Sequence, residues 1–127
     1  MSNVKERKLF LVDDEAIIVL ELSEYLKRQG YSIAGMAYDV KTALKRAAGK
    51  DFDLAILDLN IHGENTGIDL AKTLCSEIDT PVIFISGNSE RNVSSLLEKQ
   101  RFSFPYSYMI KPFNKHDLQR TITKHLS

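Results

Sequence analysis

Acidic side chains stand at the ends of two apolar segments of this sequence. Asp13 and Asp14 follow the run Leu9–Val12, and Asp58 follows the run Leu54–Leu57. Neighbouring carboxylates repel one another, and burial increases the cost of that repulsion. A multivalent cation offsets it, and hard oxygen ligands select Mg²⁺, with Mn²⁺ as the alternative. The sequence therefore predicts a cation site made by the three aspartates, provided that the fold brings the two segments together.

Two polar residues follow the later apolar segments. Ser86 ends the stretch "PVIFIS", and Lys111 follows "YSYMI". A hydroxyl and an ammonium suit the binding of a phosphoryl group, because phosphoryl transfer depends on positioning and charge neutralisation. Each residue also has an ordinary explanation: the paired aspartates could open a helix, Asp58 could be a loop residue, Ser86 a turn former and Lys111 a surface lysine. Together, the aspartates, Ser86 and Lys111 indicate a phosphoryl-binding site more specifically than any one of these residues does alone.

These residues can meet only if the segments between them form a parallel sheet. Apolar runs alternate along the chain with segments of helical spacing. The runs are Leu9–Val12, Tyr31–Ala37, Leu54–Leu57, Val82–Ile85 and Tyr106–Ile110. Such alternation predicts an α/β domain with right-handed crossovers and helices on both faces of the sheet. Ligands of these sheets bind beyond the carboxyl ends of the strands. We expect the second run, which contains Gly35, toward an edge.

Apolar residues at helical spacing mark the helices between the runs. They are Ile18, Leu22 and Leu26; Ala43, Leu44, Ala47 and Ala48; Ile68, Ala71, Leu74 and Ile78; Val93, Leu96 and Leu97; and Leu118, Ile122 and Leu126. Asp39 and Asn114 are the expected N-caps of the second and fifth helices. The single cysteine, Cys75, falls among apolar residues of the third helix, which indicates a buried thiol.

Length and charge narrow the class of protein. The 127 residues fit a single domain spanning 1–127, with a core of about 7–126. Lys plus Arg and Asp plus Glu both number 17, so the chain lacks the basic excess of proteins that bind nucleic acid or membranes. There is no signal-peptide pattern and no apolar run near 18 residues, so we expect a cytoplasmic protein. We expect no output domain within these residues.

Taken in order, these segments resemble the receiver domain of two-component response regulators. The resemblance spans residues 7 to 126 and rests on "VDDE" at 12–15, "LDL" at 57–59, "ISG" at 85–87 and "KPF" at 111–113. It implies a flavodoxin-like α/β fold, a doubly wound five-stranded parallel sheet of order 2-1-3-4-5 with five helices. It also implies a cis peptide bond between Lys111 and Pro112.

The resemblance implies a role for each acidic residue. Asp58 matches the carboxylate that accepts a phosphoryl group from a histidine of a sensor kinase or phosphotransfer protein. Asp14 and Asp58, with the backbone carbonyl of Asn60, match the direct ligands of Mg²⁺, and Asp13 matches the acid that reaches the ion through water. The expected chemistry is self-phosphorylation and autodephosphorylation, with no separate substrate turned over.

Other residues match the parts that bind the phosphoryl group and respond to it. Lys111 matches the lysine that contacts a phosphoryl oxygen, and Ser86 the hydroxyl that moves to bond it. Tyr108 matches the aromatic switch that turns inward when Ser86 moves, and Asn60 and Asn88 match positions that tune the lifetime of the phosphate. The resulting change in the surface of the fourth helix, fifth strand and fifth helix would control an output partner or a phosphorylation-dependent dimer.

The sequence departs from the family pattern after Asp58. The usual Met-Pro pair is missing from "DLNIHGENTG", and the Asp58–Gly67 loop is one residue longer than is usual in the family. We expect this loop to be polar and flexible, with His62 facing solvent. We also expect Glu15 to face solvent in the first turn of the first helix, and His116 and His125 to lie on the surface.

Two questions stay open at this stage. The aromatic residues Phe102, Phe104 and Tyr106 could pack in the core or form a contact patch on the output face. The function could be that of a switch acting on a partner, a phosphorelay intermediate or a phosphate sink. Less favoured are a receiver that never takes phosphate and a small Mg²⁺-dependent phosphatase with an aspartate nucleophile. Such phosphatases carry a second acid two residues after the nucleophile, where this chain has Asn60.

Overall fold

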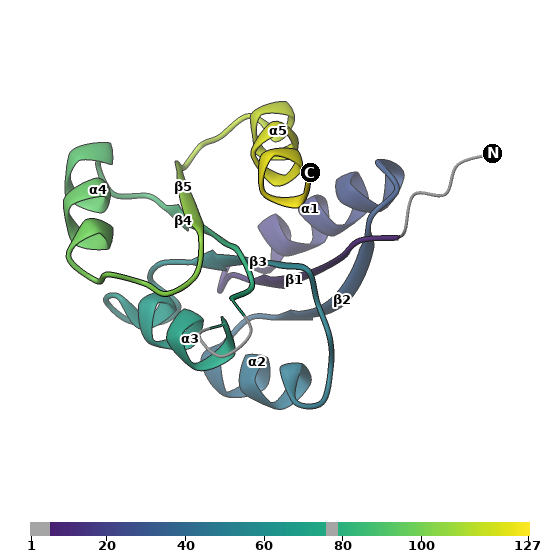
Figure 1. Ribbon diagram of the computed structural model, residues 1–127, viewed down its shortest axis with the longest axis horizontal. Coiled ribbons are helices and arrows are strands. Elements are labelled where there is room, and N and C mark those ends of the chain that lie inside the picture. Colours follow the sequence, from purple (N-terminus) through teal and green to yellow (C-terminus); the bar gives the residue numbers. More distant parts are fainter. Residues whose placement is uncertain (1–5, 76–78) are drawn as a thin grey trace.

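Five strands alternate with five helices in the computed structural model, which describes residues 6–75 and 79–127 (Figure 1). The strands are β1 (Lys8–Val12), β2 (Ser32–Ala37), β3 (Leu54–Asp58), β4 (Val82–Ser86) and β5 (Tyr106–Ile110). The helices are α1 (Ala16–Arg28), α2 (Val40–Ala47), α3 (Thr66–Cys75), α4 (Glu90–Glu98) and α5 (Lys115–Leu126). Each element lies where the hydrophobic pattern predicts it, and Ile78 lies outside the described residues.

The strands form one parallel sheet of order β2-β1-β3-β4-β5, which confirms the predicted fold. Every residue of β3 and β4 is buried, as continuous apolar runs require in a sheet covered on both faces. The strands β2 and β5 form the edges and are mostly half-buried. The prediction that the second run lies at an edge is therefore confirmed.

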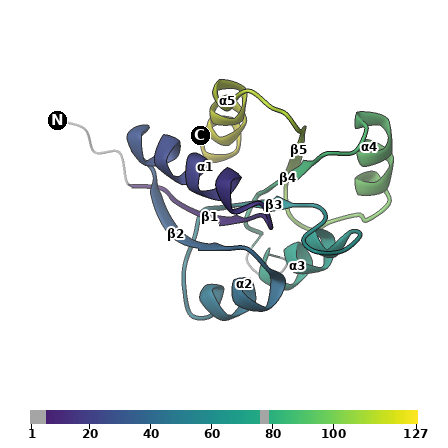
Figure 2. The ribbon, with the colours of Figure 1, turned by 180° about the vertical axis from the view of Figure 1, so that it is seen from behind.

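Two helical layers cover the sheet. Helices α1 and α5 lie on one face, and α2, α3 and α4 lie on the other (Figures 1 and 2). The first layer buries side chains such as Leu22 and Ile122, and the second buries side chains such as Ile68 and Leu97. None of the helices in the described ranges is long and apolar enough to cross a membrane. The two cores hold the sheet rigid, and with it the strand ends that carry the polar residues.

Side-chain caps fix where helices begin. Asp39 accepts a hydrogen bond from Thr42 N, and Asn114 accepts from His116 N and Asp117 N, so both predicted N-caps are confirmed. Ser89 caps α4 in the same way, which sequence reasoning missed. Cys75 is fully buried as predicted, and burial raises the pKa of its thiol to about 12. The thiol is therefore a core side chain.

The aromatic residues before β5 pack into the core on the side of α4. Phe104 is buried, and its ring centroid lies 4.6 Å from that of Phe102. Phe102 also stacks on Phe84 of β4, at 5.5 Å between centroids, and meets Tyr106 edge to face. Of the two predicted roles for this cluster, the geometry agrees with core packing.

Basic side chains from the α2 segment cover the free edge of β2. The guanidinium of Arg46 donates to the carbonyl oxygen of Met36 at 2.7 Å, and Nζ of Lys50 donates to that of Ala34 at 3.4 Å. Both acceptors belong to β2, which pairs with β1 on its other side. Two carbonyls of the edge strand are thus satisfied by side chains.

Helix α3 approaches the end of β3 closely at a glycine. A Cβ atom on Gly67 would lie 2.1 Å from the carbonyl oxygen of Asp58 and 2.9 Å from Cα of Leu59. The amide of Gly67 donates to the carbonyl oxygen of Leu59 at 2.8 Å. Only a residue without a side chain fits between α3 and the strand end that carries Asp58.

Candidate functional site

Three aspartates meet at the carboxyl ends of β1 and β3. Val12 and Leu57 are paired across these strands, so the residues that follow them, Asp13 and Asp58, stand side by side. Asp13 and Asp58 are 3% and 5% exposed, and each aspartate, Asp14 included, offers a carboxylate oxygen within 4.8 Å of those of the others. The structure therefore brings together the residues that the sequence predicts for the cation site.

Backbone amides orient one oxygen of each carboxylate. Oδ1 of Asp13 accepts from the amide of Glu15 at 2.8 Å, and Oδ1 of Asp58 accepts from that of Asn60 at 3.2 Å. Oδ2 of Asp14 accepts from the amide of His62 at 2.9 Å. These amides come from the residues that follow β1 and β3, so the local chain itself sets the direction of the three acids.

The other oxygen of Asp13 lacks a hydrogen bond. Oδ2 of Asp13 is buried, and it is the only such side-chain atom without a hydrogen bond within residues 6–75 and 79–127. It lies 3.0 Å from Nζ of Lys111, an ion pair outside hydrogen-bonding geometry. A buried carboxylate oxygen without a hydrogen bond, next to two further aspartates, is a suitable ligand for a hard divalent cation such as Mg²⁺, which binds oxygen ligands.

Lys111 extends from the end of β5 into the acidic cluster. Its Nζ lies 3.0 Å from Oδ2 of Asp13, 3.0 Å from Oε1 of Glu15 and 3.5 Å from Oδ2 of Asp58. Burial alone would lower the pKa of Lys111, but the hydrogen bond that Nζ donates to Glu15 and the nearby charges of Asp13 and Asp58 outweigh it, so the pKa is raised. Lys111 is a fixed cation of the pocket and not a solvated surface lysine; its bond to Pro112 is cis.

The pocket disfavours the charged form of Asp58. Burial, followed by the charge of Asp13, raises the pKa of the Asp58 carboxyl to about 7, while the Asn60 amide and Lys111 act in the opposite direction. A divalent cation would supply the positive charge that favours ionisation. The acidity of Asp58 is therefore expected to depend on what occupies the cluster.

Ser86 ends β4, the strand next to the one that carries Asp58, and Tyr108 lies on the following strand of the sheet, β5. Ser86 is fully buried. Its hydroxyl oxygen accepts a hydrogen bond from the amide of Asn88, and its carbonyl oxygen accepts one from the amide of Lys111. Tyr108 of β5 pairs in register with Phe84, two residues before Ser86, and packs half-buried against the core. The side chain of Asn88 accepts from the amide of Ser89 at the start of α4.

Glu15 and His62 face solvent, as the sequence predicts, but both also contact the cluster. Glu15 is exposed but holds Lys111, and His62, also exposed, bonds Asp14 through its amide, with Nδ1 3.7 Å from Oδ2 of Asp14. The signal for Glu15 was its place one residue after the paired aspartates. His125, predicted at the surface, is half-buried and bonded to the Ser107 hydroxyl, and burial lowers its pKa.

The loop after β3 is held by its own hydrogen bonds. The hydroxyl of Thr66 contacts the amide and carbonyl of Ile61 and the carbonyl of Gly63, and Oδ1 of Asn60 accepts from the amide of Asn65. The loop was expected to be flexible because its residues are polar. Its polar groups instead bond one another.

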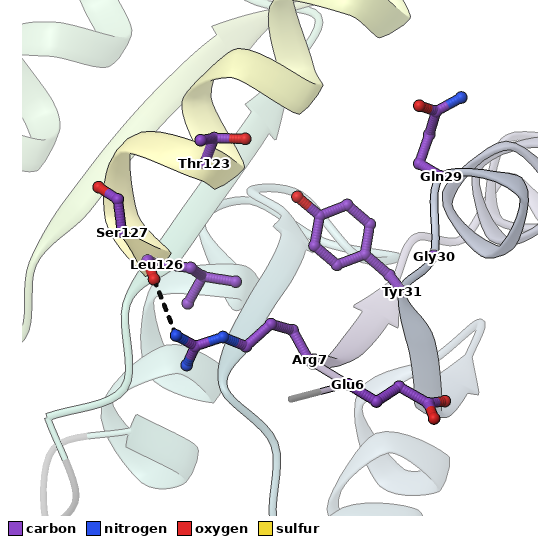
Figure 3. A pocket seen from close by; sticks show the side chains of 8 residues that line it. All are labelled: Glu6, Arg7, Gln29, Gly30, Tyr31, Thr123, Leu126 and Ser127. Carbon is purple, nitrogen blue, oxygen red and sulfur yellow. Dashed lines mark hydrogen bonds between the residues drawn. The ribbon is translucent and has the colours of Figure 1, made fainter. Parts of the chain in front are cut away.

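A cavity of about 430 Å³ opens beside the cluster. Glu15, Lys111, Pro112 and Phe113 line it together with residues of α1. A second cavity, of about 540 Å³, lies at the opposite end of the sheet, between the residues before β1 and β2 and the end of α5 (Figure 3). There Arg7 donates to the carbonyl oxygen of Leu126. The carboxylates, and with them the candidate chemistry, lie beside the smaller cavity.

Comparison with known proteins agrees with this arrangement. The family model "Response regulator receiver domain" matches residues 9–123. The Mycobacterium tuberculosis transcriptional regulatory protein PdtaR is 33% identical over 112 residues, covering 88% of this chain and 53% of PdtaR. The Bacillus subtilis transcriptional regulatory protein ResD is 29% identical over 119 residues, covering 93% and 47%. The chain thus spans about half the length of these relatives.

Solved structures agree in fold. A CheY-like receiver domain protein from Methanospirillum hungatei superposes with a TM-score of 0.81 at 21% identity, covering 96% of this chain and 94% of that one. The receiver domain of Erythrobacter litoralis PhyR gives a TM-score of 0.79 at 29% identity, covering 95% and 90%.

Proposed function

The chain belongs to the response regulator receiver domain family, and from this premise we propose that it is a phosphorylation-controlled signalling switch with Asp58 as phosphoacceptor. The observation that carries the proposal is the position of Asp58, buried at a strand end among two further aspartates and 3.5 Å from Nζ of Lys111. A single carboxylate could be a structural residue, but three acids and a lysine in one pocket suit phosphoryl transfer.

The proposed reaction uses the carboxylate of Asp58 as nucleophile. An oxygen of Asp58 forms a bond to phosphorus as the P–N bond to a phosphohistidine breaks, and the imidazole leaves with the electron pair. Lys111 neutralises charge on the transferred group, and the Ser86 hydroxyl donates to it. Mg²⁺, held by Asp13, Asp14, Asp58 and the carbonyl of Asn60, would supply further charge neutralisation. The domain catalyses only its own phosphorylation and dephosphorylation.

The donor would be a sensor histidine kinase or a phosphotransfer protein that docks on α1. Ile17 and Leu20 of α1 are 71% and 49% exposed, although both are large apolar side chains. They lie on α1, which begins at Ala16, two residues after Asp14. Exposed apolar residues beside a reactive pocket suit a helical partner surface that presents its histidine to Asp58. A cytoplasmic location fits such a partner.

The output would be a change in the surface of α4, β5 and α5. Ser86 and Tyr108 are the proposed switch, because Ser86 ends the strand next to that of Asp58, and Tyr108 of the adjoining strand packs against the core on the side of α4. Relatives such as PdtaR are named transcriptional regulators, and the relatives named PhyR include structures titled anti-anti-sigma factor. We propose a protein partner or a phosphorylation-dependent dimer as the target, with no nucleic acid bound directly by this domain.

Roles as a phosphorelay intermediate or a phosphate sink use the same chemistry and stay as alternatives. The phosphatase alternative gains no support, because the position two residues after Asp58 holds Asn60, whose side chain is engaged by the amide of Asn65. We propose that residues 1–127 form one receiver domain with a core of about 7–126.

Phosphorylation by acetyl phosphate in Mg²⁺ tests the proposal. We expect the protein to gain one phosphoryl group on Asp58, measured by intact mass, and Asp58→Asn to gain none while keeping its circular dichroism spectrum. Beryllofluoride with Mg²⁺ should bind the natural protein and shift the NMR signals of Ser86 and Tyr108, but not those of the variant. Stable phosphorylation of Asp58→Asn would show that Asp58 is not the acceptor.

Asn88 provides a test of phosphate lifetime. Asn88 is exposed, two residues after Ser86, where a larger charged side chain can reach the approach of water without disturbing the core. We expect Asn88→Arg to change the decay rate of phosphorylated protein by roughly threefold or more, an effect of about 0.7 kcal/mol on the barrier, while phosphorylation itself persists. An unchanged decay rate, measured after removal of the donor, would count against this role.

A further inference from the structure

Three carboxylates share the ammonium group of Lys111. Oδ2 of Asp13 and Oε1 of Glu15 each lie 3.0 Å from Nζ, and Oδ2 of Asp58 lies 3.5 Å away. An ammonium group has three protons to donate. Nζ donates one of them to Oε1 of Glu15, so a phosphoryl group that binds Lys111 competes with these carboxylates for the ammonium group.

The carboxylate that is easiest to replace is Glu15. Its side chain is 60% exposed, whereas those of Asp13 and Asp58 are 4% and 6% exposed. A buried acid that loses its cation is left without solvation, which is costly, while an exposed acid returns to water at little cost. The gradient of exposure thus makes Glu15 the replaceable partner of Lys111.

The backbone of Glu15 is fixed although its side chain is exposed. Glu15 is the N-cap residue of α1, its carbonyl oxygen accepts from the amides of Ile18 and Val19, and its own amide donates to Asp13. The carboxylate therefore extends from a rigid point at the mouth of the 430 Å³ cavity, which Glu15 and Lys111 both line.

We propose that Glu15 is a positioning residue that holds Lys111 at the pocket mouth and competes with the phosphoryl group for it. The inference rests on the proposed function, because it requires a phosphoryl group on Asp58. Glu15 delays phosphorylation in two ways: it occupies a proton of Lys111, and its negative charge repels an anionic donor. After transfer it draws Lys111 away from the phosphoryl group and shortens the lifetime of phosphorylated Asp58.

A matched pair of variants tests the inference. Glu15→Gln removes the charge that contacts Lys111, and Glu21→Gln removes an equal charge from another residue that lines the same cavity. In acetyl phosphate and Mg²⁺, we expect Glu15→Gln to be phosphorylated roughly two- to fivefold faster than Glu21→Gln, the range expected for one exposed ion pair. Its phosphorylated form should also decay more slowly. Equal rates for the two variants overturn the inference.

Two further measurements separate positioning from a general charge effect. The ¹⁵N-labelled ammonium signal of Lys111 should move in Glu15→Gln and stay in place in Glu21→Gln. In a Lys111→Ala background, Glu15→Gln should accelerate phosphorylation no more than Glu21→Gln does; a full Glu15 effect in that background overturns the role through Lys111. If no protein gains phosphate on Asp58, the proposed function fails; if all gain it at one rate, only the Glu15 inference fails.

Discussion

In the proposed reaction Asp58 must be ionised to attack phosphorus, and its surroundings oppose ionisation. Burial and the adjacent Asp13 raise its pKa to about 7 from a usual value of 3.8. At neutral pH a cation-free pocket therefore keeps part of the Asp58 carboxyl protonated, which lowers the fraction that can act as a nucleophile. Reactivity at this residue depends on positive charge in the cluster, which makes cation binding a condition for phosphoryl transfer in our proposal.

The raised pKa of Asp58 predicts a pH-dependent stability. In the folded state the Asp58 carboxyl keeps its proton up to about pH 7, whereas in the unfolded state it loses the proton near pH 4. The contribution of Asp58 to the free energy of unfolding is therefore greatest below about pH 4 and falls as the pH rises to about 7. Asp58→Asn has no such carboxyl, so without Mg²⁺ it should become more stable relative to the natural protein as the pH rises from about 4.5 to about 8. We expect the difference in unfolding free energy to grow by a few kcal/mol, on the order of 1.4 kcal/mol per pKa unit.

Urea unfolding at both pH values measures this difference, and Mg²⁺ provides the control. Adding Mg²⁺ at pH 8 should stabilise the natural protein more than Asp58→Asn, because a ligand that binds only the folded state raises its stability. A stability difference that stays constant between the two pH values would contradict the raised pKa.

Gly67 is the point where the geometry of an element controls the site. Alanine in a helix gains about 1 kcal/mol over glycine from propensity. At this position its Cβ would lie 2.1 Å from the backbone oxygen of Asp58, a contact that only movement of α3 or β3 can relieve. The clash outweighs the propensity, so we expect Gly67→Ala to destabilise the fold by more than about 2 kcal/mol.

Gly87→Ala is the matched control, because a Cβ atom on Gly87 meets no atom within 4 Å. Urea unfolding of both variants measures the difference, and we expect a change below about 0.5 kcal/mol for Gly87→Ala. Gly67→Ala should also show weaker Mg²⁺ binding by calorimetry, since movement of the β3 end displaces Asp58. A Gly67→Ala protein as stable as the natural one would refute the packing argument.

The elements of this fold could be predicted from the sequence because each carries its own pattern. The continuous apolar runs of β1, β3 and β4 predict buried central strands, and Asp39 and Asn114 predict the starts of α2 and α5. The parallel topology then places Asp13 beside Asp58, although 45 positions separate them in the sequence. The hydrophobic periodicity and the parallel topology together were enough to predict that the three aspartates form a cluster.

Contacts made by exposed side chains and by loop backbone could not be predicted in this way. The bond between Glu15 and Lys111 joins residues 96 positions apart and depends on side-chain reach, which no periodic pattern encodes. The bond from the His62 amide to Asp14 depends on a loop conformation in which His62 adopts a φ of 54°. The half-buried contact of His125 with Ser107 likewise depends on how α5 packs on β5.

At the scale of the whole molecule, the acidic cluster and the larger of the two cavities described above lie at opposite ends of the sheet. The acidic cluster lies at the carboxyl ends of the strands, and the cavity between Arg7, Tyr31 and Leu126 lies at the other end (Figure 3). The net charge is zero, so no long-range field attracts partners to the molecule as a whole. Recognition must then come from local surfaces such as the exposed apolar face of α1.

The covered edge of β2 has a consequence for how the protein behaves at high concentration. An open edge strand is a template on which strands of other molecules can pair. Arg46 and Lys50 occupy two carbonyls of β2 and place positive charge along it. We expect the double variant Arg46→Ala/Lys50→Ala to stay folded and to aggregate faster, measured by light scattering and thioflavin T fluorescence during incubation.

The control removes the same charge from elsewhere on α2, through Lys41→Ala/Lys45→Ala, and should aggregate at a lower rate than the edge variant. Equal rates would attribute the effect to net charge instead of strand coverage. By this reasoning the two basic side chains hinder strands of other molecules from pairing with the β2 edge of the sheet.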